Sequence, residues 1–285
     1  MQCANVHSLT HPDVFAIVAD LCSKSDIVCL LEVNLSSYSE RHMLNAQELV
    51  NEALATFIPS TKWTASIRAV SSAIDRESFV VCYNATKLLI HEHTASDVVN
   101  YGTPKALQLY RCDFFRSLPS ATPISFILGL VHYPSSGAWN NDTNRSKLFK
   151  AAKTNGVDVL TGDFNCKKKC SSELVFPFNA TDFRETTTTR KPYDQVFWQG
   201  AKFEKFAVVR EVVRAVEADA VVDGNQPLTT ARKLPVSNHF PIRCWLKIKA
   251  PVEVKQEAQL RIRAQPNSPH MGKAAVKVEA GVIEG

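Results

Sequence analysis

The feature that most constrains the fold is a buried strand that ends in two oxygen-bearing side chains. A mostly apolar run at 157–160 follows Gly156 and stops in Thr161-Gly-Asp-Phe-Asn. Side chains two positions apart on a strand point the same way, so the oxygens of Asp163 and Asn165 can face one site. Hard oxygen ligands of this kind suit Mg²⁺. A tight turn would explain the same residues, because Gly, Asp and Asn all favour turns.

The start of the chain has the pattern of a strand, a helix and a second strand. Thr10 and Asp13 form a capping-box-like pair, and helical periodicity follows to about Cys22. The run at 26–31 is almost continuously apolar and ends in Glu32, which is typical of a strand buried on both faces. Elements of this length indicate a βαβ unit.

The remaining pattern predicts many strands and few helices. Helices are expected at 44–57 and from 142 or 143 to 152, and strands are expected at 2–7, 63–67, 78–83, 88–92, 107–114, 124–132, 193–198, 203–209 and 240–248. Such a composition of elements around one core predicts an α+β sandwich in which helices cover two sheets.

The apolar pattern ends after Lys249. Residues 250–285 are rich in Ala, Pro, Lys, Glu and Gly and have no sustained apolar face. A segment of this kind cannot bury enough apolar surface to fold by itself. We therefore expect one domain at 1–249 and a disordered tail at 250–285.

Composition narrows the possible partners and compartments. The formal net charge of +5 and the pI near 8.7 permit a polyanionic partner without requiring one. No apolar run reaches the roughly 18 residues of a membrane span, and residues 1–7 lack the pattern of a signal peptide. Cys166 and Cys170 have no second pair of cysteine or histidine ligands at the spacing of a zinc site, so no zinc site is expected. We expect a monomeric, reduced protein of the nucleus or cytoplasm, secreted only if a signal has been removed.

Polar side chains recur at the ends of the expected strands. Each has a plain alternative, such as a solvated strand end or a half-buried histidine, but their number favours a shared site. The eight positions are Asn5, Glu32, Glu77, His132, Asp163, Asn165, Asp194 and His239.

These positions lie in motifs that, taken in order over residues 2–249, resemble the DNase I-like endonuclease/exonuclease/phosphatase superfamily. The Gly-Asp-Phe-Asn motif alone is weak, whereas the ordered set at family-like spacing is strong. The resembling segments are Asn5-Val6, Asp26–Val33, Arg76–Phe79, Tyr110-Arg111, Leu130–His132, Thr161–Asn165, Tyr193–Phe197 and Ser237–Ile242. The resemblance implies a four-layer α/β/β/α fold and divalent-metal hydrolysis of a phosphodiester.

The resemblance also implies a role for each residue. Glu32 and Asp163, with Asn5, Asn165 and Asn238, would hold Mg²⁺ or Mn²⁺ and the phosphate, and an additional structural Ca²⁺ is a further expectation. His132 and His239 would form the acid/base pair, since a histidine pKa lies near working pH. Glu77 would orient His132, and Asp194 would orient His239.

Asn238 departs from the family pattern. The closing motif of the family is Ser-Asp-His, whereas this chain has Ser237-Asn238-His239. Asn keeps an oxygen ligand but removes one negative charge, so metal affinity is expected to fall. Two interpretations remain: a weaker nuclease, or a binding protein that keeps the groove and has lost turnover.

The resemblance implies an Mg²⁺-dependent endonuclease whose substrate is nucleic acid, with DNA first. Arg111 is a candidate phosphate contact, and Lys167, Lys168 and Lys169 follow the metal motif directly, although a solvated loop explains them equally well. The Arg and Tyr that wedge the minor groove in DNase I-like enzymes are replaced by Asn34 and Asp75. RNA or a phospholipid/inositol phosphate head group is therefore an alternative substrate.

Overall fold

The computed structural model describes the greater part of the first of two compact units, Met1–Ile248. The described residues are 2–5, 12–33, 40–69, 77–92, 94–115, 122–135, 140–166, 175, 177–180, 193–199, 203–204, 208–210, 242–244 and 247–248. The expected tail at 250–285 lies outside them.

The first sheet has six strands in the order β13-β14-β1-β2-β4-β3. Their bounds are β1 Gln2–Asn5, β2 Ile27–Val33, β3 Trp63–Ala69, β4 Ser78–Asn84, β13 Val208–Arg210 and β14 Ile242–Cys244. Strands β1 and β2 are parallel and are connected through α1, Pro12–Ser23, so the predicted βαβ unit is confirmed. Helix α2, Glu40–Phe57, follows β2 and begins one turn before the predicted start.

The second sheet has seven strands in the order β10-β11-β9-β8-β7-β5, with β6 also paired to β7. Their bounds are β5 Leu88–Ile90, β6 Val98–Val99, β7 Leu107–Phe114, β8 Ile124–His132, β9 Val159–Asp163, β10 Asn179–Ala180 and β11 Asp194–Trp198. A 3-10 helix, η1 Ala95–Asp97, precedes β6, and helix α3, Asp142–Thr154, connects the parallel strands β8 and β9. A third, two-stranded sheet pairs β12, Phe203–Glu204, with β15, Lys247–Ile248.

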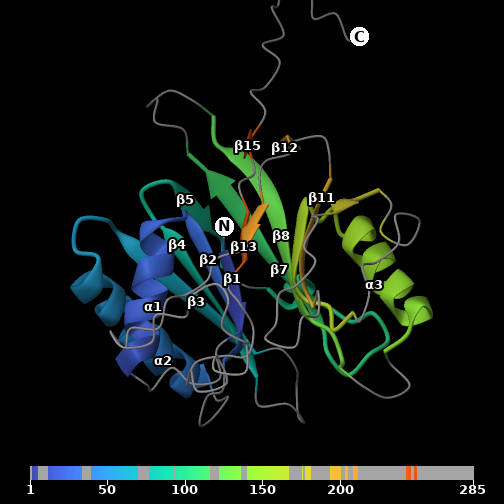
Figure 1. Cartoon of the computed structure of the whole chain (residues 1–285), viewed down its shortest axis with the longest axis horizontal. Coiled ribbons are helices and arrows are strands. Elements are labelled where there is room, and N and C mark those ends of the chain that lie inside the picture. The colour runs from blue at the N-terminus through green and yellow to red at the C-terminus, as the bar shows by residue number, and fades with distance from the viewer. Residues whose placement is uncertain are drawn as a thin grey trace, which may run out of the picture. The chain divides into compact units, whose positions relative to one another are not determined.

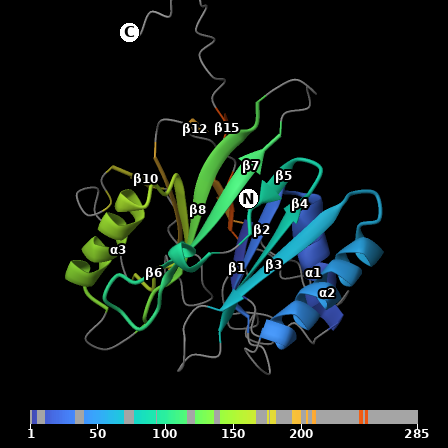
Figure 2. The ribbon, with the colours of Figure 1, turned by 180° about the vertical axis from the view of Figure 1, so that it is seen from behind.

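Three apolar clusters hold the layers together. Helices α1 and α2 pack on one sheet and α3 packs on the other, and Figures 1 and 2 show the helices on opposite sides of the sheets. The cluster between the two sheets joins β2 and β4 to β5, β7, β8, β9 and β11 through side chains such as Leu31, Phe79, Tyr110, Leu130 and Val196. The layers are therefore α/β/β/α, and the predicted fold class is confirmed.

The end of the described fold differs from the sequence prediction. The expected single strand at 240–248 is two strands in different sheets, β14 beside β1 and β15 beside β12. The expected strand at 203–209 likewise corresponds to β12 and β13. Alternation with a period of two predicts that successive side chains of a strand point to opposite faces, but it does not predict which sheet the strand joins.

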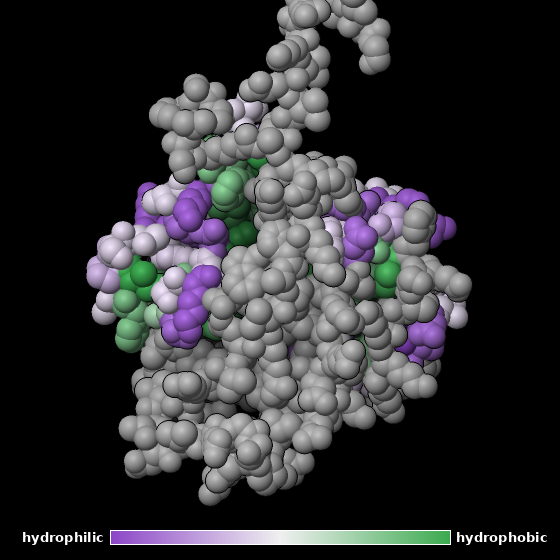
Figure 3. Space-filling model, turned by 45° about the horizontal axis from the view of Figure 1, so that its top comes forward, coloured by the Kyte–Doolittle hydropathy of each residue, from purple (hydrophilic) through white to green (hydrophobic). Residues whose placement is uncertain are grey.

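The described surface mixes polar and apolar residues. Figure 3 shows one face of the molecule, and hydrophilic and hydrophobic residues lie side by side on its described part. None of the described helices is both long and apolar enough to cross a membrane.

Candidate active site

Strands β8 and β9 bring His132 and Asp163 together. The two strands are parallel and pair with His132 opposite Asp163, at the carboxyl end of both. Gly162, directly before Asp163, has a φ of 145°, and a Cβ added there would lie 1.8 Å from the carbonyl oxygen of Val131. The Gly of the Gly-Asp-Phe-Asn motif is therefore required by the close approach of the two backbones.

Glu32 reaches the same place through an irregularity in β2. Leu31 belongs to the cluster between the sheets, whereas Leu30 and Val33 belong to the cluster beneath α1 and α2. Strict alternation would point Glu32 toward the helices, as it does Leu30. The register with β4 shifts between Leu30 and Val33, and Glu32 has a φ of 54°. This bulge turns Glu32 toward His132.

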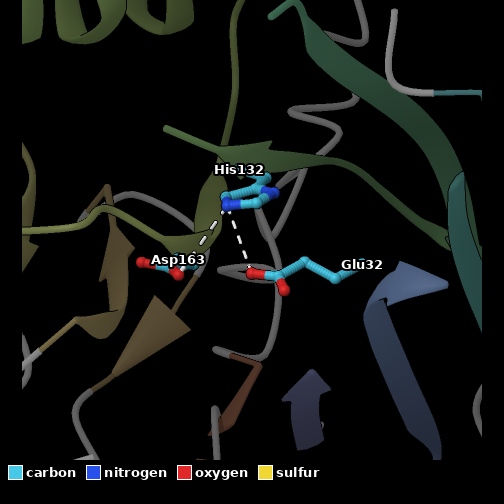
Figure 4. A group of neighbouring side chains, drawn as sticks. All are labelled: Glu32, His132 and Asp163. Carbon is cyan, nitrogen blue, oxygen red and sulfur yellow. Dashed lines mark ion pairs between the residues drawn. The ribbon is translucent and has the colours of Figure 1, made fainter. Parts of the chain in front are cut away.

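Glu32, His132 and Asp163 form one compact group. Nε2 of His132 lies 3.2 Å from Oε1 of Glu32 and 3.9 Å from Oδ2 of Asp163. Figure 4 shows both carboxylates approaching the same ring nitrogen from different strands. His132 and Asp163 are buried and Glu32 is half-buried, so all three act in a partly water-excluded environment.

Glu77 contacts the opposite nitrogen of the same ring. Nδ1 of His132 lies 2.7 Å from Oε2 of Glu77. A carboxylate only accepts, so Nδ1 carries the proton in this contact and Nε2 is left facing Glu32 and Asp163. Burial alone would raise the pKa of Glu77, but the hydrogen bond from His132 and the charges of His132 and Lys105 hold it at about 2. The predicted Glu77–His132 pair is thus present in the described structure.

The pKa of His132 is raised, although burial acts against this. Burial lowers it, whereas the hydrogen bond to Glu77 and the negative charges of Glu32 and Asp163 raise it more, and Lys105 opposes them. A histidine in this setting holds a proton readily and can return it to a nearby oxygen.

Lys105 is a member of the site that the sequence reasoning missed. Its Nζ lies 3.0 Å from Oε2 and 3.3 Å from Oε1 of Glu77, and 2.9 Å from Nδ1 of His132. The ammonium is buried. Lys105 precedes β7 in a segment without a family-like motif, so the only sequence signal was its position directly before a buried strand.

Asn165 is fixed by local hydrogen bonds in a left-handed conformation, with a φ of 46°. Its backbone N–H donates to Oδ1 of Asp163 over 2.7 Å, and its side-chain amide donates to the carbonyl of Tyr133 over 2.7 Å. Asn140, which Arg145 contacts, lies 3.4 Å from the carbonyl of Asn165. Asn140 therefore links the start of α3 to the loop after β9. This connection could not be predicted from the sequence.

Asp194 lies next to the group across the sheet. It pairs with Asp163 in the register of β11 and β9, and its side chain is buried. Asn5 pairs with Leu31, one position before Glu32, and only its backbone is described. His239, Asn238 and Lys167–169 lie outside the described residues, so their predicted roles stay predictions.

Arg111 is not brought together with this group. Leu109, two positions earlier on β7, belongs to the cluster under α3, so alternation places Arg111 on that side of the sheet. Its Nε forms an ion pair of 3.0 Å with Asp97. His132, like Leu130, faces the space between the sheets. Among the described residues, Lys105 supplies positive charge beside His132.

The donor set fits a hard divalent cation. Glu32, His132 and Asp163 each offer one possible ligand atom, and these atoms lie within 4.8 Å of one another. The two carboxylates are the hard ligands of this set, which leaves Nε2 of His132 available for a proton. Carboxylate oxygens suit Mg²⁺ and Mn²⁺, and clustered carboxylates removed from water need a positive partner. No second group of this kind occurs among the described residues, so the structural Ca²⁺ stays a prediction.

Comparison by sequence finds no relatives: no protein-family model matches the chain, and no curated protein does. Comparison by structure finds the fold. The human Nocturnin catalytic domain with bound sulfate is similar with a TM-score of 0.54 at 12% identity, over 87% of this chain and 93% of that chain. An endonuclease/exonuclease/phosphatase family protein from Bacteroides thetaiotaomicron is similar with a TM-score of 0.52 at 14% identity, over 86% of this chain and 96% of that chain.

A third similar structure is that of D. rerio TDP2 complexed with a single strand DNA product. Its TM-score is 0.52 at 12% identity, over 86% of this chain and 97% of that chain. At these identities the likeness concerns the arrangement of the strands and helices. The chain therefore has the endonuclease/exonuclease/phosphatase fold, as its DNase I-like sequence motifs implied.

Proposed function

We propose that this protein hydrolyses phosphodiester bonds with a divalent metal and that DNA is its substrate. The observation that carries the proposal is the arrangement around His132. Two carboxylates converge on Nε2, and a third binds Nδ1. Phosphodiester hydrolysis needs positive charge on the phosphate oxygens and a proton acceptor or donor beside the reacting oxygens, and this arrangement can provide both.

The chain's own residues divide the chemistry between them. Glu32 and Asp163 would hold Mg²⁺ or Mn²⁺, with Asn5, Asn165 and Asn238 as further oxygen donors, and the bound ion supplies positive charge to the phosphate. Glu77 keeps the proton of His132 on Nδ1. Nε2 is then the atom that exchanges a proton with a phosphate-bound oxygen or with water.

His239 would perform the complementary proton transfer, oriented by Asp194. One histidine accepts a proton from water as the other donates one to the leaving oxygen, so no proton is lost from the site overall. Support for this half of the mechanism comes from the family-like motifs at 193–197 and 237–242 and from the burial of Asp194 beside Asp163.

DNA is favoured as the substrate by charge and by fold. The chain is net positive, and three lysines follow the Gly-Asp-Phe-Asn motif. One protein of similar fold was solved with a single strand DNA product. The second candidate is hydrolysis of RNA, or of a phosphate ester in a phospholipid or inositol phosphate head group, favoured by Asn34 and Asp75 in the places of the groove-wedging residues.

The compartment and oligomeric state belong to the same proposal. Four cysteines whose side chains are described, Cys22, Cys29, Cys82 and Cys112, form no disulfide and are buried. Free thiols are usual in the reducing interior of the cell. We propose an intracellular protein on this basis, and the monomeric state stays a prediction.

The proposed function is tested by incubating purified protein with supercoiled plasmid. We expect Mg²⁺ or Mn²⁺ to support conversion to the nicked circle and EDTA to abolish it, because the metal supplies the charge on the phosphate. Structured RNA and a soluble inositol phosphate, assayed in parallel, separate the two candidate substrates. Absence of metal-dependent hydrolysis for every substrate would refute the proposal.

Asn238→Asp tests whether the site is a weakened catalytic site or one that binds without turnover. Restoring the carboxylate adds one negative charge, so we expect the half-saturating Mg²⁺ concentration to fall about tenfold and kcat to rise. Asn45→Asp, at an exposed position of α2, controls for a general effect of charge. An unchanged rate at all Mg²⁺ concentrations, with metal-independent binding of DNA, would instead indicate a binding protein.

A further inference from the structure

We propose that Lys105 is a positioning residue that holds the Glu77 carboxylate against Nδ1 of His132. The proposal rests on the proposed hydrolytic function for its kinetic consequence only. Its structural content concerns three side chains that come from different parts of the chain and meet between the two sheets.

The geometry shows two donors that share one acceptor. Oε2 of Glu77 lies 2.7 Å from Nδ1 of His132 and 3.0 Å from Nζ of Lys105. An ammonium cannot accept a hydrogen bond, and Nδ1 already donates to Glu77, so the 2.9 Å between Nζ and Nδ1 is a close approach of two donors. What holds them there is the carboxylate between them.

Lys105 is well placed to restrict Glu77. Glu77 lies directly before β4 and is half-buried. The ammonium contacts both of its carboxylate oxygens, at 3.0 and 3.3 Å, which opposes rotation of the carboxylate about its terminal bond. With side-chain exposures of 9% for Lys105 and 19% for Glu77, the ion pair is poorly screened by solvent.

The segment before β7 fixes Lys105 in turn. Tyr101 stacks on Tyr133, the residue after His132, with ring centroids 6.2 Å apart. The hydroxyl of Thr103 donates to the carbonyl of Lys105 over 2.7 Å. The segment that carries the ammonium is thus anchored to the strand end that carries the imidazole. This shared anchoring distinguishes Lys105 from a surface lysine that meets a carboxylate by chance.

Charge makes the arrangement more than a packing contact. Three carboxylates, those of Glu32, Glu77 and Asp163, surround His132. Without a fixed cation, the half-buried carboxylate of Glu77 would be repelled by the other two and would lose a partner. The cation at Lys105 therefore favours the one geometry in which Nδ1 donates to Glu77 and Nε2 faces the proposed metal ligands.

The first test uses NMR and needs no activity. In the wild-type protein at fixed pH we expect the Nδ1–H proton of His132 to give an exchange-protected signal, assigned by its loss in His132→Gln. Lys105→Met should broaden or abolish this signal, whereas Lys105→Arg should retain it. Lys105→Gln, which keeps a donor without the charge, is the second variant if Lys105→Met does not fold. A protected signal in every folded, uncharged variant at position 105 would overturn the proposal.

The second test separates positioning from substrate binding. We expect Lys105→Met to lower kcat about 10- to 100-fold with KM within about twofold, because misplacement of a catalytic group slows the chemical step. Lys105→Arg should recover most of the rate. In a Glu77→Gln background, Lys105→Met should change kcat by less than about twofold, since the interaction is already lost. Lys87→Met, which removes an exposed lysine paired with Asp26, is the matched control.

The alternative outcomes are distinct. A rise in KM alone would make Lys105 a substrate contact, and equal effects with and without Glu77 would make it independent of the pair; either result overturns the proposal. If the wild-type protein hydrolyses no substrate, the proposed function fails, and the NMR comparison still decides the role of Lys105.

Discussion

His132→Gln is expected to lower kcat for phosphodiester hydrolysis by about 10³-fold, within the range that general acid–base groups contribute. Nε2 of His132 is the atom on which two carboxylates converge, at 3.2 Å for Glu32 and 3.9 Å for Asp163. Glutamine fills similar space and can hydrogen-bond to Glu77, but its amide does not exchange a proton near neutral pH. The measurement is single-turnover hydrolysis at saturating Mg²⁺.

A matched histidine separates this effect from a general one. His91 also pairs with a carboxylate, Asp113, at 2.8 Å, but its side chain is 46% exposed and it belongs to the edge strand region of the second sheet. His91→Gln should retain the wild-type rate within about twofold. Both variants should keep the wild-type circular dichroism spectrum. A His132→Gln rate within about threefold of wild type would show that Nε2 moves no proton in the slow step.

Gly162→Ala is expected to lower the free energy of unfolding by roughly 3–5 kcal/mol, adding backbone strain to a steric clash. The added Cβ would lie 1.8 Å from the carbonyl oxygen of Val131, and φ at this residue is 145°. The atom that it meets is backbone, so relief requires β8 and β9 to separate. That separation would also break the pairing of His132 with Asp163. Urea denaturation followed by circular dichroism measures the loss.

Gly156→Ala is the control for the backbone contribution. Gly156 also has a positive φ, 65°, but the nearest atom to an added Cβ is a side-chain methyl of Ile127 at 3.9 Å. A cost of about 1 kcal/mol is expected there, from the left-handed conformation alone. Equal losses for the two alanine variants would mean that the close approach of β8 and β9 is not what requires glycine at 162.

Sequence pattern was informative where a residue's role is local. The apolar runs before Glu32, His132 and Asp163 predicted strands, and each side chain lies at the end of the strand expected. Glu77 could be assigned to His132 through the resemblance, and the two are in hydrogen-bond contact. The fold class also followed, because the alternation of apolar residues and the order of the elements limit how the layers can stack.

The sequence pattern was insufficient where the direction of a side chain, or the residue that it contacts, depends on another strand. Alternation would have pointed Glu32 at the helices, and only the bulge against β4 turns it to the site. Arg111 lies on the α3 side of β7, where it pairs with Asp97, and not beside His132, so its phosphate contact stays a prediction. Neither the bulge nor the ion pair can be inferred from one strand alone, because each is set by contacts across the sheet.

What the sequence by itself determined is a set of chemical groups and the strand ends that carry them. These include the carboxylates of Glu32, Glu77 and Asp163 and the imidazole of His132, together with the two helix-covered sheets that its family resemblance implied. What only the tertiary structure decided is the geometry among them, above all the approach of Glu32 to His132 and the buried ammonium of Lys105. The physical reason is the difference in sequence separation between the residues that interact. Strand formation and alternation depend on neighbours within a few residues, whereas an ion pair such as that of Lys105 with Glu77 depends on how two sheets pack.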